Sequence, residues 1–526
     1  MAEHPNRPRG SARAAILIAV LTASVAGLPF LPRGEAVPET VLRSVPIDVR
    51  TLLRPGPGLS LGADSGGLRA AERARTVTAS ACAPIWFDGM AFTWHQASGA
   101  AVTIRTAAGG PGRYWRAVTL EPEGGPDPGT PEYRPGQQGS AYLWTGGARC
   151  ARFSLELPAG AELRDLRVLF INSSGTAEGP GTGPRDVGPV ATGDLGPPFG
   201  VPRADAMTQR PRIIAREQWG ANPKLMNCTP WVAPFLKMGF IHHTAGSNAY
   251  SRAQADDVVR GVYAYHTNGR GWCDIGYNFL VDRYGDVFEG RSGGVTNDVV
   301  GAAQMGFNTG AFSVSMMGNF DAVRPPAHAV GVLERLIAWR LDVAHVNPRA
   351  RTVMVSAGGS TTRFQTGTEV RLRTISGHRD TGLTACPGRY LYPLIPAIRD
   401  VAGSMGLPKI YQPTLSTTSI PSDGPLSVRI RARSSASFAW RVIVLGPSGD
   451  TVVVIRGSKG PTLDVRWVAD GSAQPLEAGE YRVLVETTGA VGGRARPATL
   501  TVVAEPPPSP SPTLTPTPTP TVSPTP

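Results

Sequence analysis

The segment Ser376-Gly377-His378-Arg379-Asp380-Thr381-Gly382-Leu383-Thr384-Ala385-Cys386-Pro387-Gly388 carries the clearest chemical signal of this chain. It places His378 and Cys386 on either side of a short polar turn, and His242 stands far upstream, after the largely apolar run Leu236–Ile241. Two imidazoles and one thiolate are a known ligand set for catalytic zinc, in which water takes the fourth position. These residues therefore predict a zinc-dependent hydrolase.

The spacing of these residues suits a metal ion. Because His378 and Cys386 flank a turn, both can approach one ion at ~2.0 to 2.3 Å. His242 follows a run that reads as a buried strand, which would hold its imidazole at the strand's end. A site of two neutral imidazoles and one thiolate keeps a positive charge, which lowers the pKa of bound water toward ~7.

The chain has five cysteines, so disulfides formed between cysteines of the same region use four of them and leave one over. We expect a Cys82–Cys150 disulfide in the N-terminal region and a Cys228–Cys273 disulfide in the central region. Cys386 then remains, and a metal ion would bind its thiolate. The alternative is a disulfide between Cys386 and Cys228 or Cys273.

Size and charge set broad limits. A chain of 526 residues predicts about three domains at ~150 residues each. The formal charge is 52 − 40 = +12. A net positive charge of this size is typical of proteins that bind nucleic acid, a membrane surface or an anionic wall polymer. The alternative is that the charge only keeps the protein in solution.

The N-terminus has the three-part pattern of a secretory signal. Basic residues precede the apolar segment Ala14–Leu28, and Ser24-Val25-Ala26 offers small residues for cleavage. We expect a signal peptide over residues 1–26, with an uncleaved N-terminal anchor as the alternative. Later runs are too short or too polar to cross a membrane, so we expect no transmembrane span in the mature, exported chain.

Changes of composition along the chain after the predicted signal indicate a multidomain protein. Residues 38–173 predict an N-terminal β-sandwich with a leading irregular segment, and the Gly/Pro-rich stretch 174–207 predicts a linker. Strand-like and helix-like runs mix over 208–402, which predicts an α/β domain with a mixed β-sheet flanked by helices. Alternating runs over 411–503 predict an immunoglobulin-like sandwich. The Pro/Ser/Thr repeats of 504–526 predict a disordered tail.

Six blocks within the central region occur together in one order. They resemble the peptidoglycan recognition protein family and its relatives, the type 2 N-acetylmuramoyl-L-alanine amidases. The blocks are Arg216-Glu217-Gln218-Trp219-Gly220-Ala221, Ile241-His242-His243-Thr244-Ala245, Gly271-Trp272-Cys273-Asp274-Ile275-Gly276-Tyr277-Asn278-Phe279-Leu280, Phe288-Glu289-Gly290-Arg291, Gly306-Phe307-Asn308-Thr309, and the His378 to Gly388 segment. The resemblance implies a zinc amidase domain and leaves both flanking regions outside it.

Carried over by position, the resemblance implies that His242, His378 and Cys386 bind Zn²⁺. It places Tyr277 beside the metal-bound water and gives Thr384 a catalytic role. A phenol and a hydroxyl are suitable donors to a developing oxyanion. Relatives that only bind peptidoglycan typically lack the cysteine ligand, so Cys386 favours catalysis.

One block departs from the family pattern. Relatives often read Gly-Ala-His before Gly-Phe-Asn, whereas this chain reads Gly301-Ala302-Ala303-Gln304. The departure affects the expected substrate contacts in that wall of the groove and leaves the metal site intact.

Four further residues are candidate substrate contacts: His243, His266, Trp272 and Asn278. Each of the first three has a structural alternative. His243 suits a hydrogen-bonded neighbour of the ligands, His266 suits a helix face near the core, and Trp272 suits packing.

The sequence thus predicts a secreted or wall-associated zinc amidase, which cleaves the bond between N-acetylmuramic acid and L-alanine in peptidoglycan. Anionic wall polymers are a further candidate partner. Nucleic acid is not expected, because the chain carries an export signal and its arginines are scattered. The alternative function is a module that binds or senses peptidoglycan without cutting it.

Overall fold

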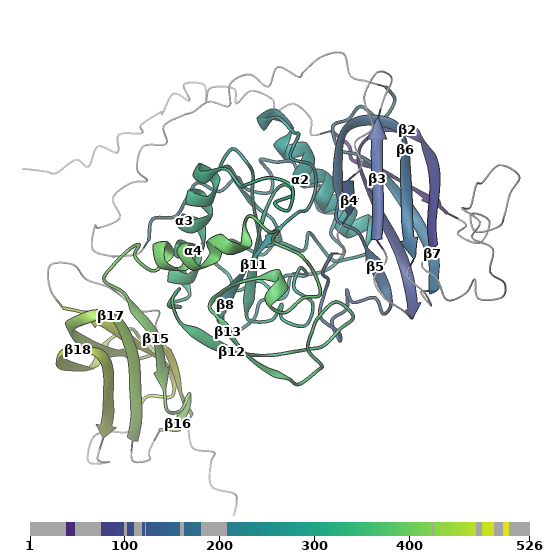
Figure 1. Ribbon diagram of the computed structural model, residues 1–526. Helices are drawn as coiled ribbons and strands as arrows, with labels where there is room; N and C mark the ends of the chain where they lie inside the picture. Colours follow the sequence, from purple (N-terminus) through teal and green to yellow (C-terminus); the bar gives the residue numbers. More distant parts are fainter. Residues whose placement is uncertain are drawn as a thin grey trace, which may run out of the picture. The chain divides into compact units, whose positions relative to one another are not determined.

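The computed structural model describes residues 38–47, 75–98, 103–109, 118–120, 123–157, 162–179, 208–422, 426–469, 476–488 and 498–503 (Figure 1). The predicted signal peptide at 1–26, most of the linker at 174–207 and the tail at 504–526 lie outside these residues. Among the described residues, no helix has the length and apolar character that a membrane crossing needs.

The N-terminal region forms a seven-stranded sheet of order β1-β7-β2-β6-β3-β4, with β5 paired to β2. Its strands are β1 (Val41–Pro46), β2 (Arg75–Ser98), β3 (Thr103–Gly109), β4 (Val118–Leu120), β5 (Gln137–Gly139), β6 (Leu143–Leu157) and β7 (Glu162–Asn172). The predicted all-β character is confirmed, while its arrangement as a sandwich stays a prediction. Strand β1 corrects the expectation of an irregular leading segment, because it pairs antiparallel with β7 along its whole length.

The central region contains the predicted mixed sheet, of order β10-β9-β11-β8-β14. Its strands are β8 (Met238–His243), β9 (Phe279–Val281), β10 (Val287–Glu289), β11 (Ala311–Met316) and β14 (Ile375–Gly377). Strand β8 pairs in parallel with both β11 and β14, and β9 pairs antiparallel with β10. A separate hairpin joins β12 (Arg351–Val355) to β13 (Glu369–Arg373).

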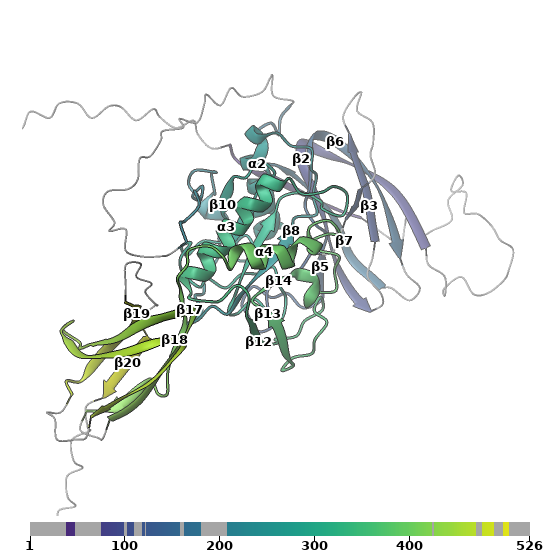
Figure 2. The same ribbon diagram turned by 60° about the vertical axis from the view of Figure 1, so that its left-hand side comes forward.

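Helices cover both faces of this sheet because its strands are apolar on both sides. Phe279 and Val281 of β9 pack in a core with α3 (Ala327–Val343) and α4 (Ile395–Ala402). Leu280, between them, belongs to a second core with α2 (Ala255–Ala264). Figures 1 and 2 show α3 and α4 close together. A capping box precedes α2, with Gln254 Oε1 accepting the Ser251 N–H at 2.9 Å.

The second core also contains side chains of the N-terminal sheet. Tyr142, Trp144, Leu169 and Ile171 are buried there together with the apolar face of α2. The Tyr142 ring lies so close to Gly261 of α2 that a Cβ at that position would collide with it. The N-terminal sheet and the central region therefore share one hydrophobic core.

The C-terminal region forms a six-stranded sheet of order β15-β17-β19-β20-β16, with β18 paired to β17. Its strands are β15 (Ile410–Leu415), β16 (Ser419–Pro421), β17 (Leu426–Leu445), β18 (Thr451–Ala469), β19 (Gly479–Thr487) and β20 (Ala498–Val503). The predicted β character is confirmed, and the immunoglobulin-like arrangement stays a prediction. Strands β17 and β18 stay paired through shifts of register, which interrupt the alternating pattern near Phe438.

Candidate metal centre

Parallel pairing brings His242 and His378 together. His242 is the penultimate residue of β8, and His378 directly follows β14, whose last residue Gly377 pairs with Ile241. The carboxyl ends of parallel strands meet at one edge of a sheet, which is where open α/β folds commonly bind ligands. Cys386 returns to the same edge after the 3-10 turn His378–Asp380.

The three side chains form a compact, buried group. The candidate ligand atoms of His242, His378 and Cys386 all lie within 4.8 Å of one another. The exposed fractions of these residues are 1%, 5% and 5%. Cys386 takes part in neither disulfide, and its Sγ lies 3.8 Å from His242 Nδ1. The backbone N–H of His243 donates to the same sulfur at 3.3 Å, which suits a thiolate acceptor.

The donor set fits a zinc ion. The Nε2 atom of His242 is buried and has no hydrogen-bond partner among the described residues. Burial, and then the rings of His378 and His243, lower the pKa of His242 well below its usual value. The ring is therefore neutral, and it offers a lone pair that a cation can satisfy. Two imidazoles and a cysteine sulfur match the chemistry that zinc prefers.

Tyr277 lies beside this group, with its ring centroid 5.6 Å from that of His242. Burial, and next the charge of Glu123, raise the pKa of Tyr277 well above its usual value. The phenol therefore keeps its proton, and it donates to Glu123 Oε1 at 3.3 Å. Tyr277 thus supplies a hydrogen-bond donor at the edge of the candidate metal centre.

Three residues shape the turn that carries His378 and Cys386. Thr384 Oγ1 accepts the Cys386 N–H at 3.1 Å, so its visible contact orders the turn, and its catalytic role stays a prediction. Asp380 caps the turn by accepting the Gly377 N–H at 2.9 Å. Gln304 donates to the His378 carbonyl at 3.2 Å and to the Thr381 hydroxyl.

The four candidate substrate contacts occupy different places. His243 lines the cavity at the metal centre, and its Nδ1 accepts the Phe320 N–H at 3.2 Å. Trp272 is buried, with its ring centroid 4.5 Å from that of His266, as packing would require. Asn278 donates to the Val299 carbonyl and accepts the Ser313 N–H, which ties the segment before β9 to β11. Their binding of substrate stays a prediction.

His266 has a defined proton position. Its Nδ1 accepts the Gly276 N–H at 3.0 Å, so the proton lies on Nε2. Nε2 lies 2.9 Å from Glu123 Oε1 and donates to it. His266 is therefore a buried link between the π-helical turn Tyr265–Gly269 and the N-terminal region.

Glu123 and Gln304 are neighbours of the site to which the sequence assigned no individual role. Glu123 lies in a Pro/Gly-rich stretch before β5, 154 positions before Tyr277, and no local pattern marks it. Gln304 stands in the block that departs from the family pattern, which was the only available signal.

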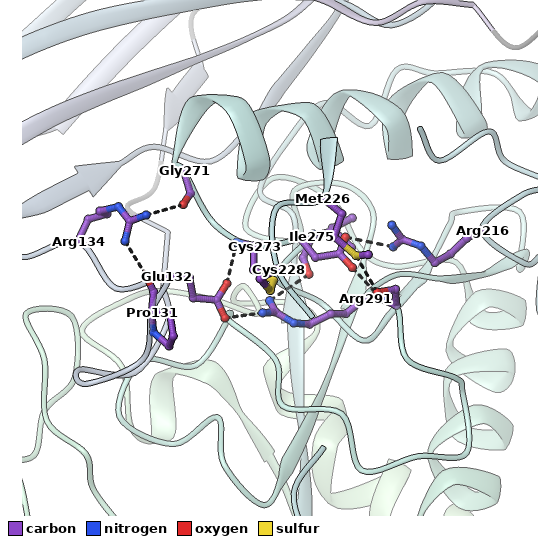
Figure 3. The surroundings of a disulfide bond; sticks show 12 residues. Pro131, Glu132, Arg134, Arg216, Met226, Cys228, Gly271, Cys273, Ile275 and Arg291 are labelled. Atoms are coloured by element: carbon purple, nitrogen blue, oxygen red, sulfur yellow. Dashed lines mark hydrogen bonds and ion pairs between the residues drawn. A yellow bond between two sulfur atoms is a disulfide. The ribbon is translucent and has the colours of Figure 1, made fainter. Parts of the chain in front are cut away.

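Both predicted disulfides are present in the structure. Cys82–Cys150 joins paired positions of β2 and β6. Cys228–Cys273 fixes the loop before β8 to the segment that leads into Tyr277 (Figure 3).

Comparisons with known proteins find relatives of the central region. Residues 233–389 match the family model described as N-acetylmuramoyl-L-alanine amidase. Peptidoglycan recognition protein 1 of Mus musculus is 31% identical over 183 residues, which make up 35% of this chain and 85% of the mouse protein. Peptidoglycan-recognition protein SC1a/b of Drosophila simulans is 29% identical over 186 residues, again 35% of this chain and 85% of the fly protein. Human PGRP-IBETAC, solved with glycosamyl muramyl pentapeptide, aligns at 28% identity over 35% of this chain and 93% of its own, with a TM-score of 0.28.

Proposed function

Because this chain belongs to the family of peptidoglycan recognition proteins and N-acetylmuramoyl-L-alanine amidases, we propose that it is a zinc-dependent amidase. Its substrate is the amide between N-acetylmuramic acid and L-alanine in peptidoglycan. The observation that carries the proposal is the buried group of His242, His378 and Cys386, whose candidate ligand atoms lie within 4.8 Å of one another.

The residues of the site have different roles in amide hydrolysis. A zinc ion held by the two histidines and the cysteine would supply a Lewis acid and an activated water molecule. Tyr277 keeps its proton, so its hydroxyl can donate to the carbonyl oxygen as negative charge develops there. The buried surroundings strengthen this hydrogen bond by excluding bulk water.

A ligand substitution tests the proposal. Cys386→Ser replaces a thiolate by a weaker ligand, so we expect loss of stoichiometric zinc and an about 100-fold or greater fall in activity. Activity is measured as release of free L-alanine amino termini from purified peptidoglycan, and zinc by elemental analysis. Tyr277→Phe is the matched control, because it removes a donor and no ligand: it should lower activity and retain zinc. Undiminished release by Cys386→Ser would falsify the assignment.

The alternative is a protein that holds peptidoglycan without cutting it. It is favoured by the family name that the mouse and fly relatives carry, which refers to recognition. Purified protein that binds muropeptides, holds no stoichiometric zinc and releases no amino termini would establish this alternative.

The remaining parts of the proposal concern location. We infer export through the predicted signal at 1–26, and residence outside the cell or at the wall. The two disulfides are in keeping with an oxidising compartment. We further propose that the flanking β regions keep the enzyme near the wall, where the net charge of +12 favours anionic polymers.

A further inference from the structure

A segment of the N-terminal region, Glu123–Glu132, lies against the candidate metal centre, and we call it the wedge. Gly124 through Asp127 are buried, although this stretch contains two glycines and a proline and has no regular secondary structure. Its partners are up to 181 positions away in the chain. The wedge is therefore held by long-range contacts with the central region.

Three carboxylates of the wedge meet three groups of donors in the central region. Glu123 accepts from His266 at 2.9 Å and Tyr277 at 3.3 Å, and pairs with Arg270 at 3.4 Å. This carboxylate is ionised: burial opposes its charge, but His266, Arg270 and Tyr277 together hold its pKa below the usual value.

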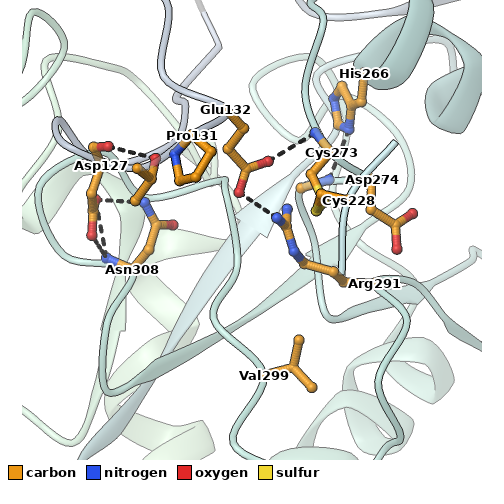
Figure 4. Close-up of polar contacts among 12 residues, drawn as sticks. Asp127, Pro131, Glu132, Cys228, His266, Cys273, Asp274, Arg291, Val299 and Asn308 are labelled. Atoms are coloured by element: carbon orange, nitrogen blue, oxygen red, sulfur yellow. Dashed lines mark hydrogen bonds and ion pairs between the residues drawn. A yellow bond between two sulfur atoms is a disulfide. The ribbon is translucent and has the colours of Figure 1, made fainter. Parts of the chain in front are cut away.

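Asp127 and Glu132 continue the pattern along the wedge. Asp127 Oδ1 accepts the Gly306 N–H at 2.7 Å. The same oxygen accepts from the Asn308 side-chain amide at 2.7 Å (Figure 4). Glu132 accepts the Cys273 N–H at 3.0 Å and pairs with Arg291 (Figures 3 and 4).

These donors need an acidic partner. Arg270 and Arg291 are buried, and a buried guanidinium is unfavourable without a paired anion. Further donors to the wedge come from the three blocks Gly271–Leu280, Phe288–Arg291 and Gly306–Thr309, namely Tyr277, Arg291 and Asn308. Together these donors form a surface suited to a peptide that carries several carboxylates. In this structure the wedge is that peptide.

The wedge also restricts the space at the metal centre. Glu123 and Gly124 line the cavity with Tyr277, His378 and Cys386, and its volume is about 20 Å³. This holds about one water molecule, whereas pockets for small ligands measure roughly 300–1,000 Å³. Gly124 lies so close to the Ala303 carbonyl and the His378 ring that a Cβ there would meet both.

We propose that the wedge is an internal occupant of the substrate groove, and that the acidic peptide of the wall polymer must displace it before cleavage. This inference rests on the proposed amidase function for the identity of the competing ligand. A cavity of about 20 Å³ leaves no room for a polymer-linked amide beside the candidate ligands, so the protein is latent until the wedge leaves. The apparent affinity for substrate is then the affinity of the open form multiplied by the fraction of molecules that are open.

The first experiment measures opening without catalysis. The full-length variant Glu123→Gln/Asp127→Asn/Glu132→Gln keeps the shape of the wedge and removes its charges. In zinc-free protein we expect a thiol reagent to modify its Cys386 at least about 10-fold faster than in the wild type, because the open fraction rises. Equal rates in the two proteins would overturn the proposal.

A matched control separates opening from general loss of stability. Asp88 is a buried carboxylate of the N-terminal sheet that accepts from Ser173 and Ser174, away from the wedge. Asp88→Asn should leave the modification rate of Cys386 at the wild-type value. A rise as large as that of the triple variant would also count against the proposal.

The second experiment measures cleavage of a soluble muramyl peptide by zinc-loaded protein. We expect kcat/KM of the triple variant to rise at least about 10-fold, mainly through a lower KM. A fall would mean that Glu123 assists the reaction, and the proposal would be wrong. If neither protein cleaves but the variant exposes Cys386, the amidase function fails and the wedge stands.

A bridged protein covers the case in which the triple variant does not fold. Gln138 Nε2 lies 3.0 Å from Ser360 Oγ, at an exposed contact between β5 and the central region. A short bismaleimide linking Gln138→Cys to Ser360→Cys should hold the wedge in place and lower cleavage at least about 10-fold. The two single-cysteine variants, treated alike, are the controls. Full activity of the bridged protein would overturn the proposal.

Discussion

The neighbouring residues His242 and His243 show how backbone geometry separates two identical side chains. Successive residues of a strand point to opposite faces, so only one of the pair can face His378 and Cys386. His242 does so, and the His243 imidazole instead accepts the Phe320 N–H at 3.2 Å. The backbone N–H of His243 still serves the site by donating to Cys386 Sγ.

Gln304 is the clearest test at the residue scale. It is buried, and its amide donates to the His378 carbonyl and the Thr381 hydroxyl, which orders the turn that carries one ligand. We expect Gln304→Ala to lower zinc affinity about 10- to 100-fold, as losses of supporting hydrogen bonds do elsewhere. The measurement is a competition titration against a chelator. Gln365→Ala, at an exposed position, is the control and should bind zinc as the wild type does.

At the scale of elements, helix α2 joins two parts of the chain. One face packs with Leu280 and Phe288 of the central sheet, and Tyr142 of the N-terminal region reaches the same core. Gly261 provides the close approach for the Tyr142 ring. A glycine that is unfavourable for the helix alone is thus required by its packing.

Replacing that glycine should reverse the ordinary rule for helices. Alanine normally stabilises a helix interior by up to ~1 kcal/mol relative to glycine. Gly261→Ala instead places a methyl group against the buried Tyr142, and overpacking of this kind costs about 1–3 kcal/mol. We expect a lower midpoint of thermal unfolding. Gly331→Ala in α3, where only the far end of Arg335 lies within 4 Å, should raise the midpoint or leave it unchanged.

Features of this fold that depend on local spacing can be predicted from the sequence, whereas features that depend on distant contacts cannot. Local patterns predicted the helices, the mixed sheet and both disulfides, because each depends on spacing or pairing within one region. Strand β1 was missed because its partner β7 lies more than 100 positions away. The sequence likewise does not show that β17 continues past Phe438, because a shift of register there breaks the alternation while pairing with β18 continues. The metal group could be predicted from two short motifs. Glu123 belongs to neither motif, and only the folded chain brings it to the site.

At the scale of the whole molecule, the hydrophobic cores differ in what they join. The core around α2 combines residues of the N-terminal sheet with the central region, so these parts depend on each other for burial. Among the residues that the structure describes, the core of the C-terminal sheet draws its buried members from positions 410 to 485. A polar junction connects this region to the centre, where Lys409 Nζ lies 2.9 Å from Thr208 Oγ1 and 3.3 Å from Asp342 Oδ2.

We therefore expect two calorimetric transitions in the full-length protein: one for the N-terminal and central regions together, and one for the C-terminal sheet. Zinc binds only the folded metal centre, so it should stabilise the first unit by about 2.7 kcal/mol at a free concentration about 100 times Kd. The second transition should not move. Cys386→Ser, which lacks a ligand, should remove the zinc-dependent shift and retain both transitions. Separate melting of the N-terminal sheet, or an equal zinc shift in both transitions, would contradict the shared core.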